Sequence, residues 1–526
     1  MTQVDKIFFQ FFLVMLMPLY QTNGQGLSIV YNQDSTLRAE GMIDSQYKEG
    51  IWKFYNPQNH LVQEGKYIQG KEDGFWNEYY PNKNIKRQVH FKNGVLDGPF
   101  KEFFENKRIA STGNMREGVL DGPFVQYYPN GTFKSKGQYS QGKKSGEWRD
   151  YHTHGPLEKR YNYEEDQLVG KVLKYDVYEN LEQEENYNGG KLNGRWRQYY
   201  PHREVQVDGF YKDDERDSVW VEYFPDGRSS TIKRYKNNLP HGEWKYFYEN
   251  GALLANEYYE TGTPKGTWIE YYPNKRAKVI KHYKLGLQDS TYFEYSQTGQ
   301  KLMEGQYELG VRTGPWITYF DNGGVNSIGK YNNDQKEGLW KFFNEKGVLL
   351  SEGEYKLGLE DGQWFNYYDN GGALSIGGFI YGMEHGLWGT FHKNGKLNQE
   401  ETWENGKLIE IGKYYHVTGD TLPRGTLTNG NGTKLAYHDN GNLSTTGNFQ
   451  LGAAHGRWEY YYENGNPSSV GVILEGGKQN QWQYFFDNGR LEAEGEYLND
   501  VRVGAWKFYN KRGRLVRSYN YDEESS

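Results

Sequence analysis

The chain of 526 residues contains no cysteine. No disulfide framework, thiolate metal site or cysteine nucleophile can therefore form. Apolar residues are also scarce, because hydrophobic residues make up only 36% of the chain. Beyond the N-terminal segment, no stretch of sequence is apolar enough to span a bilayer as a helix.

A dominant charge of either sign is missing as well. The chain has 62 basic and 69 acidic residues, mixed along its length, and a net charge of −7. Nucleic-acid binding requires a basic patch or stripe, which this composition does not supply, so no nucleic-acid partner is expected. The same balance weighs against tight binding to anionic lipid head groups.

Aromatic residues and glycine are abundant. The chain has 48 Tyr, 26 Phe and 15 Trp, which together make 17% of its residues, and 66 Gly. Large rings bury much area per residue and favour strands. A chain this polar would otherwise be expected to be disordered, so periodicity has to decide between disorder and a repetitive β-structure.

Residues 1–26 have the pattern of a secretory signal peptide. Lys6 precedes a 14-residue apolar core, Ile7–Tyr20, and a polar end with small residues follows. The core is shorter than the roughly 20 residues of a membrane-spanning helix. The sequence therefore predicts export, with an uncleaved anchor or a buried N-terminal segment as the alternatives.

A repeat of 24 residues runs through the rest of the chain. It is marked by a Trp or its substitute at fifteen successive positions, and the series resumes at four more. The positions are Trp52, Trp76, Phe100, Phe124, Trp148, Val172, Trp196, Trp220, Trp244, Trp268, Tyr292, Trp316, Trp340, Trp364 and Trp388, then Lys434, Trp458, Trp482 and Trp506. A period of this length is typical of repeat proteins, in which each unit contacts only its neighbours.

Each repeat contains two short segments rich in aromatic residues. The first has the form of Gly74–Tyr80 (GFWNEYY), the second that of Leu61–Tyr67 (LVQEGKY), and Asn-Gly turns such as Asn488-Gly489 separate such segments. This arrangement is a strong signal for a β-hairpin. The sequence therefore predicts an all-β, long antiparallel hairpin meander of about twenty repeats, as an extended twisted single sheet or an open solenoid; a closed coil is the rival.

The recurring glycine is explained by strand register. The turns on either side place Gly65 opposite both Trp52 and Trp76, so a residue without Cβ would let the rings cover the backbone. Other residues, such as Val89, Glu185 and Glu257, stand at this position in some repeats. The pairing of glycine with Trp is therefore a preference.

The phase of the repeat divides the chain into segments. A lead or cap is expected at 27–46, a regular array at 47–394, an irregular insert or degenerate repeat at 395–431, a resumed array at 432–521, and an acidic tail at 522–526. The interval from Gly386 to Gly432 is 46 residues, two short of two repeats. The segment 395–431 is the strongest candidate for a hinge or a specialised insert.

The units, with the pattern G-x-W-x-x-Y-Y-x-x-G-x-L-x-x-x-G-x-Y, resemble the MORN-variant repeat, and in particular bacterial proteins of the YwqK-type antitoxin-like group. The resemblance covers nearly all of the chain after the signal. Such repeats occur in scaffolds, in membrane-associated proteins and in antitoxins, and the resemblance implies a bacterial source. An exported chain fits the antitoxin role poorly, because a toxin made in the cytoplasm is neutralised there.

Two motifs imitate a phosphate-binding loop. Gly137–Lys144 and Gly65–Glu72 fit G-x-x-x-x-G-K, but each lacks the following Ser or Thr and lies in a hairpin turn rather than before a helix. No Ser/His/Asp order and no pair of carboxylates stands apart from the repeats. We therefore expect no catalytic residues and no cofactor, and an enzyme is not expected.

Candidate metal ligands have simpler interpretations. His152 and His154 share a strand face, but His152 stands where other repeats have Tyr or Phe. Turn positions are expected for a second group: His241, His385, His455, Glu164–Asp166 and Asp213–Asp217. Asp213–Asp217 also lacks the glycine and terminal Glu of a calcium loop, so no metal site is assigned.

The leading hypothesis is a non-enzymatic scaffold, exported to the periplasm, the cell surface or the medium. Its extended aromatic-lined β-surface would bind a protein or glycan partner in the cell envelope. A lipid-surface module and an antitoxin-like, protein-neutralising partner are the alternatives. The ligand, the binding residues and the oligomeric state are not given by the sequence.

Overall fold

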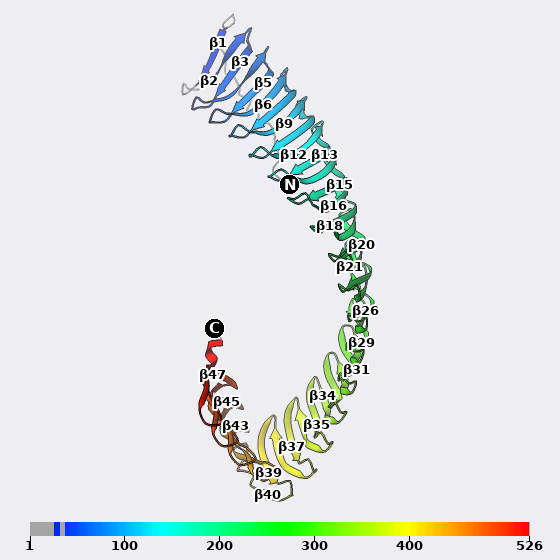
Figure 1. Cartoon of the computed structure of the whole chain (residues 1–526), viewed down its shortest axis with the longest axis vertical. Helices are drawn as coiled ribbons and strands as arrows, with labels where there is room; N and C mark the ends of the chain where they lie inside the picture. The colour runs from blue at the N-terminus through cyan, green and yellow to red at the C-terminus, as the bar shows by residue number, and fades with distance from the viewer. Residues whose placement is uncertain (1–25, 32–36, 525–526) are drawn as a thin grey trace. The chain divides into compact units, whose positions relative to one another are not determined.

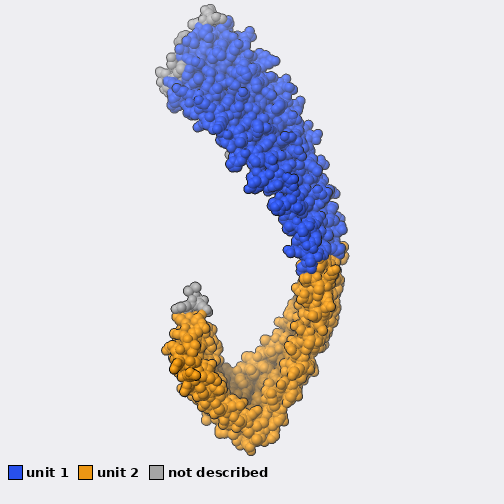
Figure 2. All heavy atoms as spheres, in the orientation of Figure 1, with its two compact units in different colours: residues 1–251 blue, residues 252–526 orange. Residues whose placement is uncertain are grey.

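The computed structural model describes residues 26–31 and 37–524. It divides into two compact units, Met1–Gly251 and Ala252–Ser526, which are coloured separately in Figure 2. The expected signal peptide, apart from its last residue, lies outside the described residues. Each unit is described by itself below.

The first unit consists of β-strands that follow one another in chain order, from blue to green in Figure 1. They are β1 (Gly26–Tyr31), β2 (Leu37–Asp44), β3 (Tyr47–Tyr55), β4 (Leu61–Ile68), β5 (Lys71–Tyr79), β6 (Ile85–Lys92), β7 (Val95–Leu96), β8 (Gly98–Phe103), β9 (Ile109–Arg116), β10 (Val119–Leu120), β11 (Gly122–Tyr127), β12 (Phe133–Ser140), β13 (Lys143–Tyr151), β14 (Leu157–Glu164), β15 (Gln167–Tyr175), β16 (Leu181–Asn188), β17 (Lys191–Leu192), β18 (Gly194–Tyr199), β19 (Val205–Lys212), β20 (Glu215–Tyr223), β21 (Ser229–Lys236), β22 (Leu239–Pro240) and β23 (Gly242–Phe247).

The second unit continues the same pattern and ends in a short 3-10 helix, η1 (Tyr521–Glu524). Its strands are β24 (Leu253–Glu260), β25 (Thr263–Pro264), β26 (Gly266–Tyr271), β27 (Ala277–Lys284), β28 (Leu287–Gln288), β29 (Ser290–Tyr295), β30 (Lys301–Glu308), β31 (Val311–Tyr319), β32 (Val325–Asn332), β33 (Gln335–Phe343), β34 (Leu349–Lys356), β35 (Leu359–Tyr367), β36 (Ala373–Ile380), β37 (Met383–Phe391), β38 (Leu397–Glu404), β39 (Lys407–Tyr415), β40 (Thr421–Leu422), β41 (Gly432–Tyr437), β42 (Leu443–Gln450), β43 (Ala453–Tyr461), β44 (Pro467–Leu474), β45 (Gly477–Phe485), β46 (Leu491–Leu498), β47 (Val501–Tyr509) and β48 (Leu515–Asn520).

Neighbouring strands pair antiparallel throughout, as β3 with β4 and β4 with β5. Some strands are interrupted near their start, so that β7 and β8 both pair with β6. The prediction of an all-β antiparallel hairpin meander is therefore confirmed, and the sheet is open rather than closed.

The glycine of each repeat lies where the register argument placed it. Gly65 is the partner of Trp52 on one side and of Trp76 on the other. A Cβ built on Gly65 would lie 2.0 Å from Cδ2 of Trp76, closer than any real carbon approaches. The ring of the following repeat therefore lies directly on the glycine backbone, and the ring of Trp52 is not among the nearest contacts.

Loss of this glycine changes the next strand. Five of the six interrupted strands follow a repeat in which another residue replaces the glycine, and the sixth follows Gly113, whose next ring is Phe124 rather than Trp. The five replacements are Val89, Glu185, Lys233, Glu257 and Lys281. A side chain at this position takes the space of the ring, so the strand changes its path where a ring follows. Tyr161 and Glu401 also replace the glycine, but Val172 and Gly412 follow them in place of a ring, and β15 and β39 are uninterrupted.

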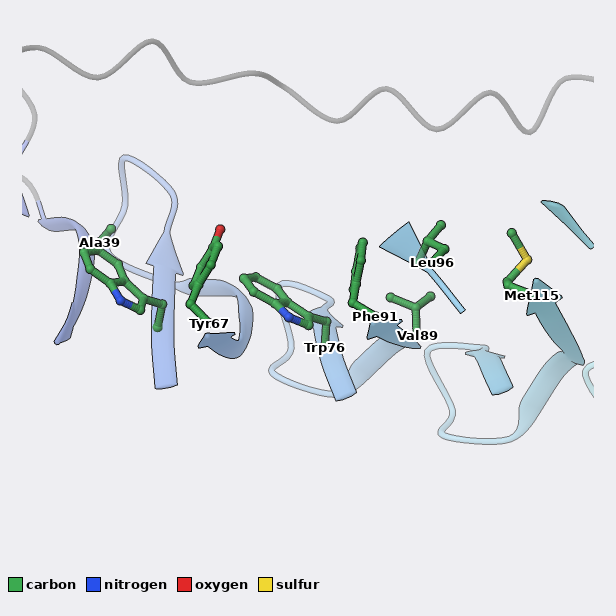
Figure 3. Close-up of a cluster of buried hydrophobic side chains, with 8 residues drawn as sticks. Ala39, Tyr67, Trp76, Val89, Phe91, Leu96 and Met115 are labelled. Carbon is green, nitrogen blue, oxygen red and sulfur yellow. The ribbon is translucent and has the colours of Figure 1, made fainter. Parts of the chain in front are cut away.

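The rings form the core of each unit, which is one layer of side chains deep. Figure 3 shows this row in the first unit, where Tyr67, Trp76 and Phe91 come from successive strands and stand side by side. Trp52 and Trp76 are 1% and 2% exposed. Because an aromatic ring buries far more area than an aliphatic side chain, a single layer of side chains is enough to form the core.

Two kinds of turn connect the strands. Long turns such as 56–60 join the two strands of a repeat, and tight turns such as Gln69-Gly70 lead into the next repeat. Both residues of a tight turn have positive φ, 49° at Gln69 and 77° at Gly70, as in a type I′ hairpin. The Gly70 amide donates to the Lys48 carbonyl of the preceding repeat, so the tight turn is held in this conformation by its neighbour.

The contact between glycine and Trp predicts the effect of adding one methyl group. Gly353→Ala should destabilise its hairpin by about 1–3 kcal/mol, because a Cβ there would lie 2.2 Å from the Trp364 ring. Gly389→Ala is the matched control, since its Cβ would meet nothing closer than 3.4 Å. Hydrogen exchange of β34 and β35 measures the loss locally, and equal protection in the two variants would contradict the prediction.

Candidate binding surface

One face of the sheet carries a ladder of alternating rings. Along the ladder, Trp rings alternate with the Tyr or Phe that stands two residues after the glycine of a repeat. Such neighbouring rings meet edge to face in many repeats. Tyr67 and Trp76 have ring centroids 5.0 Å apart at 90°, and Tyr355 and Trp364 are 5.2 Å apart at 86°. The indole of Trp76 donates a hydrogen bond of 3.1 Å to the Lys66 carbonyl. The ladder is therefore fixed by packing and by hydrogen bonds.

In many repeats a cation covers the ladder. The residue four positions before the Trp is often Lys or Arg, and its charged group lies over the indole. Lys336 lies 4.6 Å from the Trp340 ring centroid, and Lys478 lies 4.6 Å from that of Trp482. Burial lowers the pKa of the Lys336 ammonium. In these repeats the ring has glycine beneath it and a cation above it, and little of it is left for a ligand.

The second unit opens with repeats in which both features are missing. We call residues 252–295 the open stretch. Glu257 stands in place of the glycine before Trp268, and Pro264 stands in place of the covering cation. Trp268 is only half-buried, whereas Trp340 is 3% exposed. Tyr283 lies 4.4 Å from Trp268 at 42°, not edge to face, so the ladder is both uncovered and rearranged here.

A hollow of about 580 Å³ lies in the open stretch, beside the interrupted strands β25–β26 and β28–β29. Its lining combines apolar and charged groups: Glu260, Thr263, Pro264, Lys265, Gly266, His282, Tyr283, Lys284, Leu285, Asp289 and Ser290. Lys265 and Glu260 form an ion pair of 2.6 Å on its rim. The hollow offers a ring and both signs of charge, which is the chemistry of a binding site for a polar ligand.

The opposite face is tied together by tyrosine–glutamate pairs. Tyr367 donates to Glu352 at 2.9 Å, and Tyr509 donates to Glu494 at 2.9 Å, in each case fifteen residues back along the chain. Burial, together with the hydrogen bond to Glu352, raises the pKa of Tyr367 to about 12. These phenols are committed to holding neighbouring repeats together and are not free to act as acids near neutral pH.

The degenerate repeat near residue 400 has a different core. Glu401 stands in the glycine position, Gly412 stands 24 residues after Trp388, and Lys434 stands at the next Trp position. The Lys434 ammonium and the Glu401 carboxylate form an ion pair. Trp403 donates to the other Glu401 oxygen at 3.0 Å. A partly buried charge pair thus replaces the contact of ring with glycine.

Aliphatic side chains fill the space that the missing ring leaves. Leu408, Ile411 and Leu427 are each 0% exposed and pack together. Within the segment 395–431, β38 and β39 still form an antiparallel hairpin, but its register shifts twice, and β40 has only two residues. Beyond it, β41–β48 form a sheet of their own. Leu408, Ile411 and Leu427 thus give this joint a packed interior.

Of the histidines singled out by the sequence, His152 links two repeats. His152 Nε2 lies 3.0 Å from the Tyr175 carbonyl, the same link that Tyr128 makes to the Tyr151 carbonyl one repeat earlier. His152 therefore substitutes for tyrosine, as its position predicted. His241 lies in an interrupted strand between β22 and β23, whereas His385 and His455 lie in β37 and β43, next to the bulge at the following glycine. Their expected place in turns was therefore wrong for His385 and His455.

The acidic clusters lie partly in tight turns. Glu165-Asp166 and Asp213-Asp214 have positive φ, while Glu215 and Asp217 belong to β20. Asp214 accepts the Leu192 amide at 2.7 Å and so joins two repeats. Among residues 26–31 and 37–524, no three His, Asp or Glu side chains gather as a metal-binding group. Both imitations of a phosphate-binding loop span tight turns, at Gly70 and Gly142.

The buried ion pair predicts strong coupling between its two residues. Glu401→Ala should destabilise the joint by about 1–3 kcal/mol, because it leaves the Lys434 ammonium, 26% exposed, without its partner. Adding Lys434→Ala should restore part of this loss. The two single variants and the double variant, followed by denaturant unfolding, give the coupling energy; purely additive losses would contradict the prediction.

Comparisons with known proteins add a family but no close relative. No curated protein matches the chain. The crystal structure of TcdB2-TccC3 without its hypervariable C-terminal region is 10% identical, with 94% of this chain and 35% of that chain covered, at a TM-score of 0.12. The complex TcdB2-TccC3-Cdc42 is 11% identical, with 95% and 34% covered, at a TM-score of 0.11. The chain thus spans about a third of these solved chains, and TM-scores this low establish no common fold.

In the described part of the chain, no helix is long and apolar enough to cross a membrane. The family model for the MORN repeat variant matches at 48–69, 72–93, 120–141, 240–261, 312–333, 336–357, 384–405 and 454–471. These eight matches fall in phase with the repeats seen in the strands. Together with the hairpin array, they show that this chain is a MORN-variant repeat protein.

Proposed function

We propose that the chain is a non-enzymatic scaffold of the cell envelope, which binds a protein or glycan partner at the open stretch. The observation that carries the proposal is the half-buried ring of Trp268, which lacks both covering features and packs against Tyr283 in the lining of the hollow. Exposed rings are typical of binding surfaces, because they supply contact area at low entropic cost.

The surroundings of Trp268 support a polar partner. Lys265, Lys284, His282 and Asp289 line the hollow together with Tyr283, the ring that packs against Trp268, so groups for hydrogen bonds and ion pairs are available there. Rings with a polar rim suit both a peptide and a sugar chain. The antitoxin-like alternative is a special case of protein binding and would use the same surface.

The absence of an enzymatic role is part of this proposal. The polar groups of the array serve repeat after repeat in the same bonds, as in the Tyr367–Glu352 and Tyr509–Glu494 pairs. Catalytic sites instead bring together an acid, a base or a nucleophile in one place. The hollow supplies charged groups for binding and is proposed to act in recognition only.

Truncation of the exposed ring should weaken binding. After the partner is recovered from envelope extract or from a glycan array, Trp268→Ala should lower its affinity at least about tenfold, since loss of a central ring costs about 2 kcal/mol or more. Lys346→Ala, an exposed change in a long turn, is the control. Circular dichroism verifies the fold of both. Equal binding of Trp268→Ala and the wild type would exclude this surface.

The envelope location has its own test. A tagged full chain expressed in a bacterial host should appear in the periplasmic or secreted fraction, shortened by its signal. A chain that lacks residues 1–26 should stay in the cytoplasm. Full-length wild type found only in the cytoplasm would contradict export, whatever the outcome for Trp268.

A further inference from the structure

Some tight turns of the second unit expose large apolar side chains at their tips. Leu285, Leu309, Leu357 and Tyr381 are 81%, 62%, 61% and 56% exposed. All four are the first residue of a tight turn, with φ of 53°, 49°, 53° and 50°. We call these four residues the tip ridge. Leucine and tyrosine are unfavourable at this position, because the positive φ is strained for their side chains and because their apolar surface is exposed to water.

The equivalent turns of the first unit show what this position normally holds. Every tight turn from residue 69 to residue 237 has a polar residue or glycine there: Gln69, Asn93, Glu117, Gln141, Glu165, Gly189, Asp213 and Asn237. Asn, Asp and Gly accept positive φ readily, whereas a β-carbon with bulk beyond it is strained. Four apolar tips within five successive turns therefore lack an explanation in the stability of the turns themselves.

The tips cannot relax, because each tight turn is bound to the preceding repeat. Gly310 donates to the Gln288 carbonyl at 2.8 Å, and Gly382 donates to the Glu360 carbonyl at 2.8 Å. Leu287 and Leu359, both also exposed, lie against Gly310 and Gly382. Apolar residues thus flank the tips, except where Gln335 lies against Gly358, and the tips recur every two strands, about 10 Å apart.

The order of the tips is symmetric about its centre. Along the edge the five turns carry Leu285, Leu309, Asn333, Leu357 and Tyr381, with polar Thr261 and Asn405 on the outside. Rotation by 180° about the Asn333 turn would place Leu309 opposite Leu357 of a second copy. It would also place Leu285 opposite Tyr381. The spacing between tips is the same in both copies, because the two chains are identical.

The charges beside the tips favour the same arrangement. Glu308 directly precedes Leu309, and Lys356 directly precedes Leu357. Both are exposed, and within the residues that the structure describes neither side chain forms an ion pair. In the antiparallel arrangement Glu308 of each copy faces Lys356 of the other copy, which gives two such contacts. A parallel arrangement would place like charges opposite each other, which is unfavourable.

We propose that the tip ridge is a self-association surface, on which two copies of this chain pair antiparallel about the Asn333 turn. Burial of the eight tips supplies the affinity, because each fully buried leucine contributes substantially. The two Glu308–Lys356 contacts fix the direction. The polar Asn333 turns, which meet at the axis, set the register, as a buried asparagine does in coiled coils.

Asparagine substitution separates association from folding. Leu309→Asn with Leu357→Asn removes two tips per chain and gives each turn a residue that prefers positive φ. Dimerisation, measured by sedimentation of the full chain, should weaken at least about tenfold, while thermal stability of the monomer stays equal or rises. Leu451→Asn, at an exposed tip with φ of 50° outside the ridge, is the matched control and should leave the dimer unchanged.

Charge exchange tests the direction. Glu308→Lys alone and Lys356→Glu alone should each weaken the dimer, and the double variant should restore it, because every contact is then reversed. Loss of association in the double variant equal to the sum of the single losses would overturn the antiparallel arrangement.

The absence of cysteine allows a direct test of the register. Asn333→Cys in the full chain should form a disulfide-linked dimer on mild oxidation, since this turn lies on the axis. Asn405→Cys, in an equivalent turn with φ of 50°, should not. A wild-type chain that sediments as a monomer at all concentrations, or equal cross-linking at both positions, would overturn the proposal. These outcomes are independent of ligand binding at Trp268.

Discussion

The contact between an indole and a bare glycine backbone is the interaction on which the sheet depends. A ring that lies on the backbone of the neighbouring strand needs the space a Cβ would take, which is why Gly353 and Trp364 occur together. The indole N–H then reaches a backbone carbonyl ten residues earlier, as Trp364 does with Glu354. One glycine and one tryptophan per repeat thus provide burial, strand register and a hydrogen bond at once.

This contact also explains how a polar chain folds without a second layer. A sheet normally buries one face against a helix or another sheet. Here the rings cover their own backbone, and the cations Lys336 and Lys478 cover the rings. Charged residues therefore take part in covering the rings, and a low content of hydrophobic residues is sufficient for the chain to fold. Each repeat depends only on its two neighbours, so a local change is felt locally.

The sequence was sufficient to predict the hairpin array, because the 24-residue period repeats the turns on either side of Gly65, which place this glycine between Trp52 and Trp76. It did not show which rings stay uncovered. Glu257 is visible as an exception in the sequence, but the exposure of Trp268 depends on two positions, the residue that replaces glycine and the residue that replaces the cation. The combination of Glu257 with Pro264 was the available signal.

The tip ridge was hidden for a different reason. The sequence indicates that Leu357 lies in a glycine-containing turn, but only the structure shows that Leu309 and Leu357 are exposed at the tips of these turns with positive φ. The degenerate repeat was visible as a two-residue shift, but not its buried pair of Glu401 and Lys434, which are 33 residues apart. Period and composition determine contacts that every repeat shares, whereas sites arise where one repeat differs from the next.

The interruption near residue 416 follows from the same contact. Where Lys434 takes the place of the ring, nothing can lie on a glycine, and the ladder that connects repeats is cut. Leu408, Ile411 and Leu427 close the gap with a core of their own, and β41–β48 then build a separate sheet around Trp482 and Trp506. The joint nevertheless stays connected, because the Leu408 amide donates to the Gly452 carbonyl and the Tyr414 hydroxyl donates to the Tyr437 carbonyl. The most irregular repeat therefore joins the two sheets by hydrogen bonds, an aliphatic core and an ion pair in place of the contact of ring with glycine.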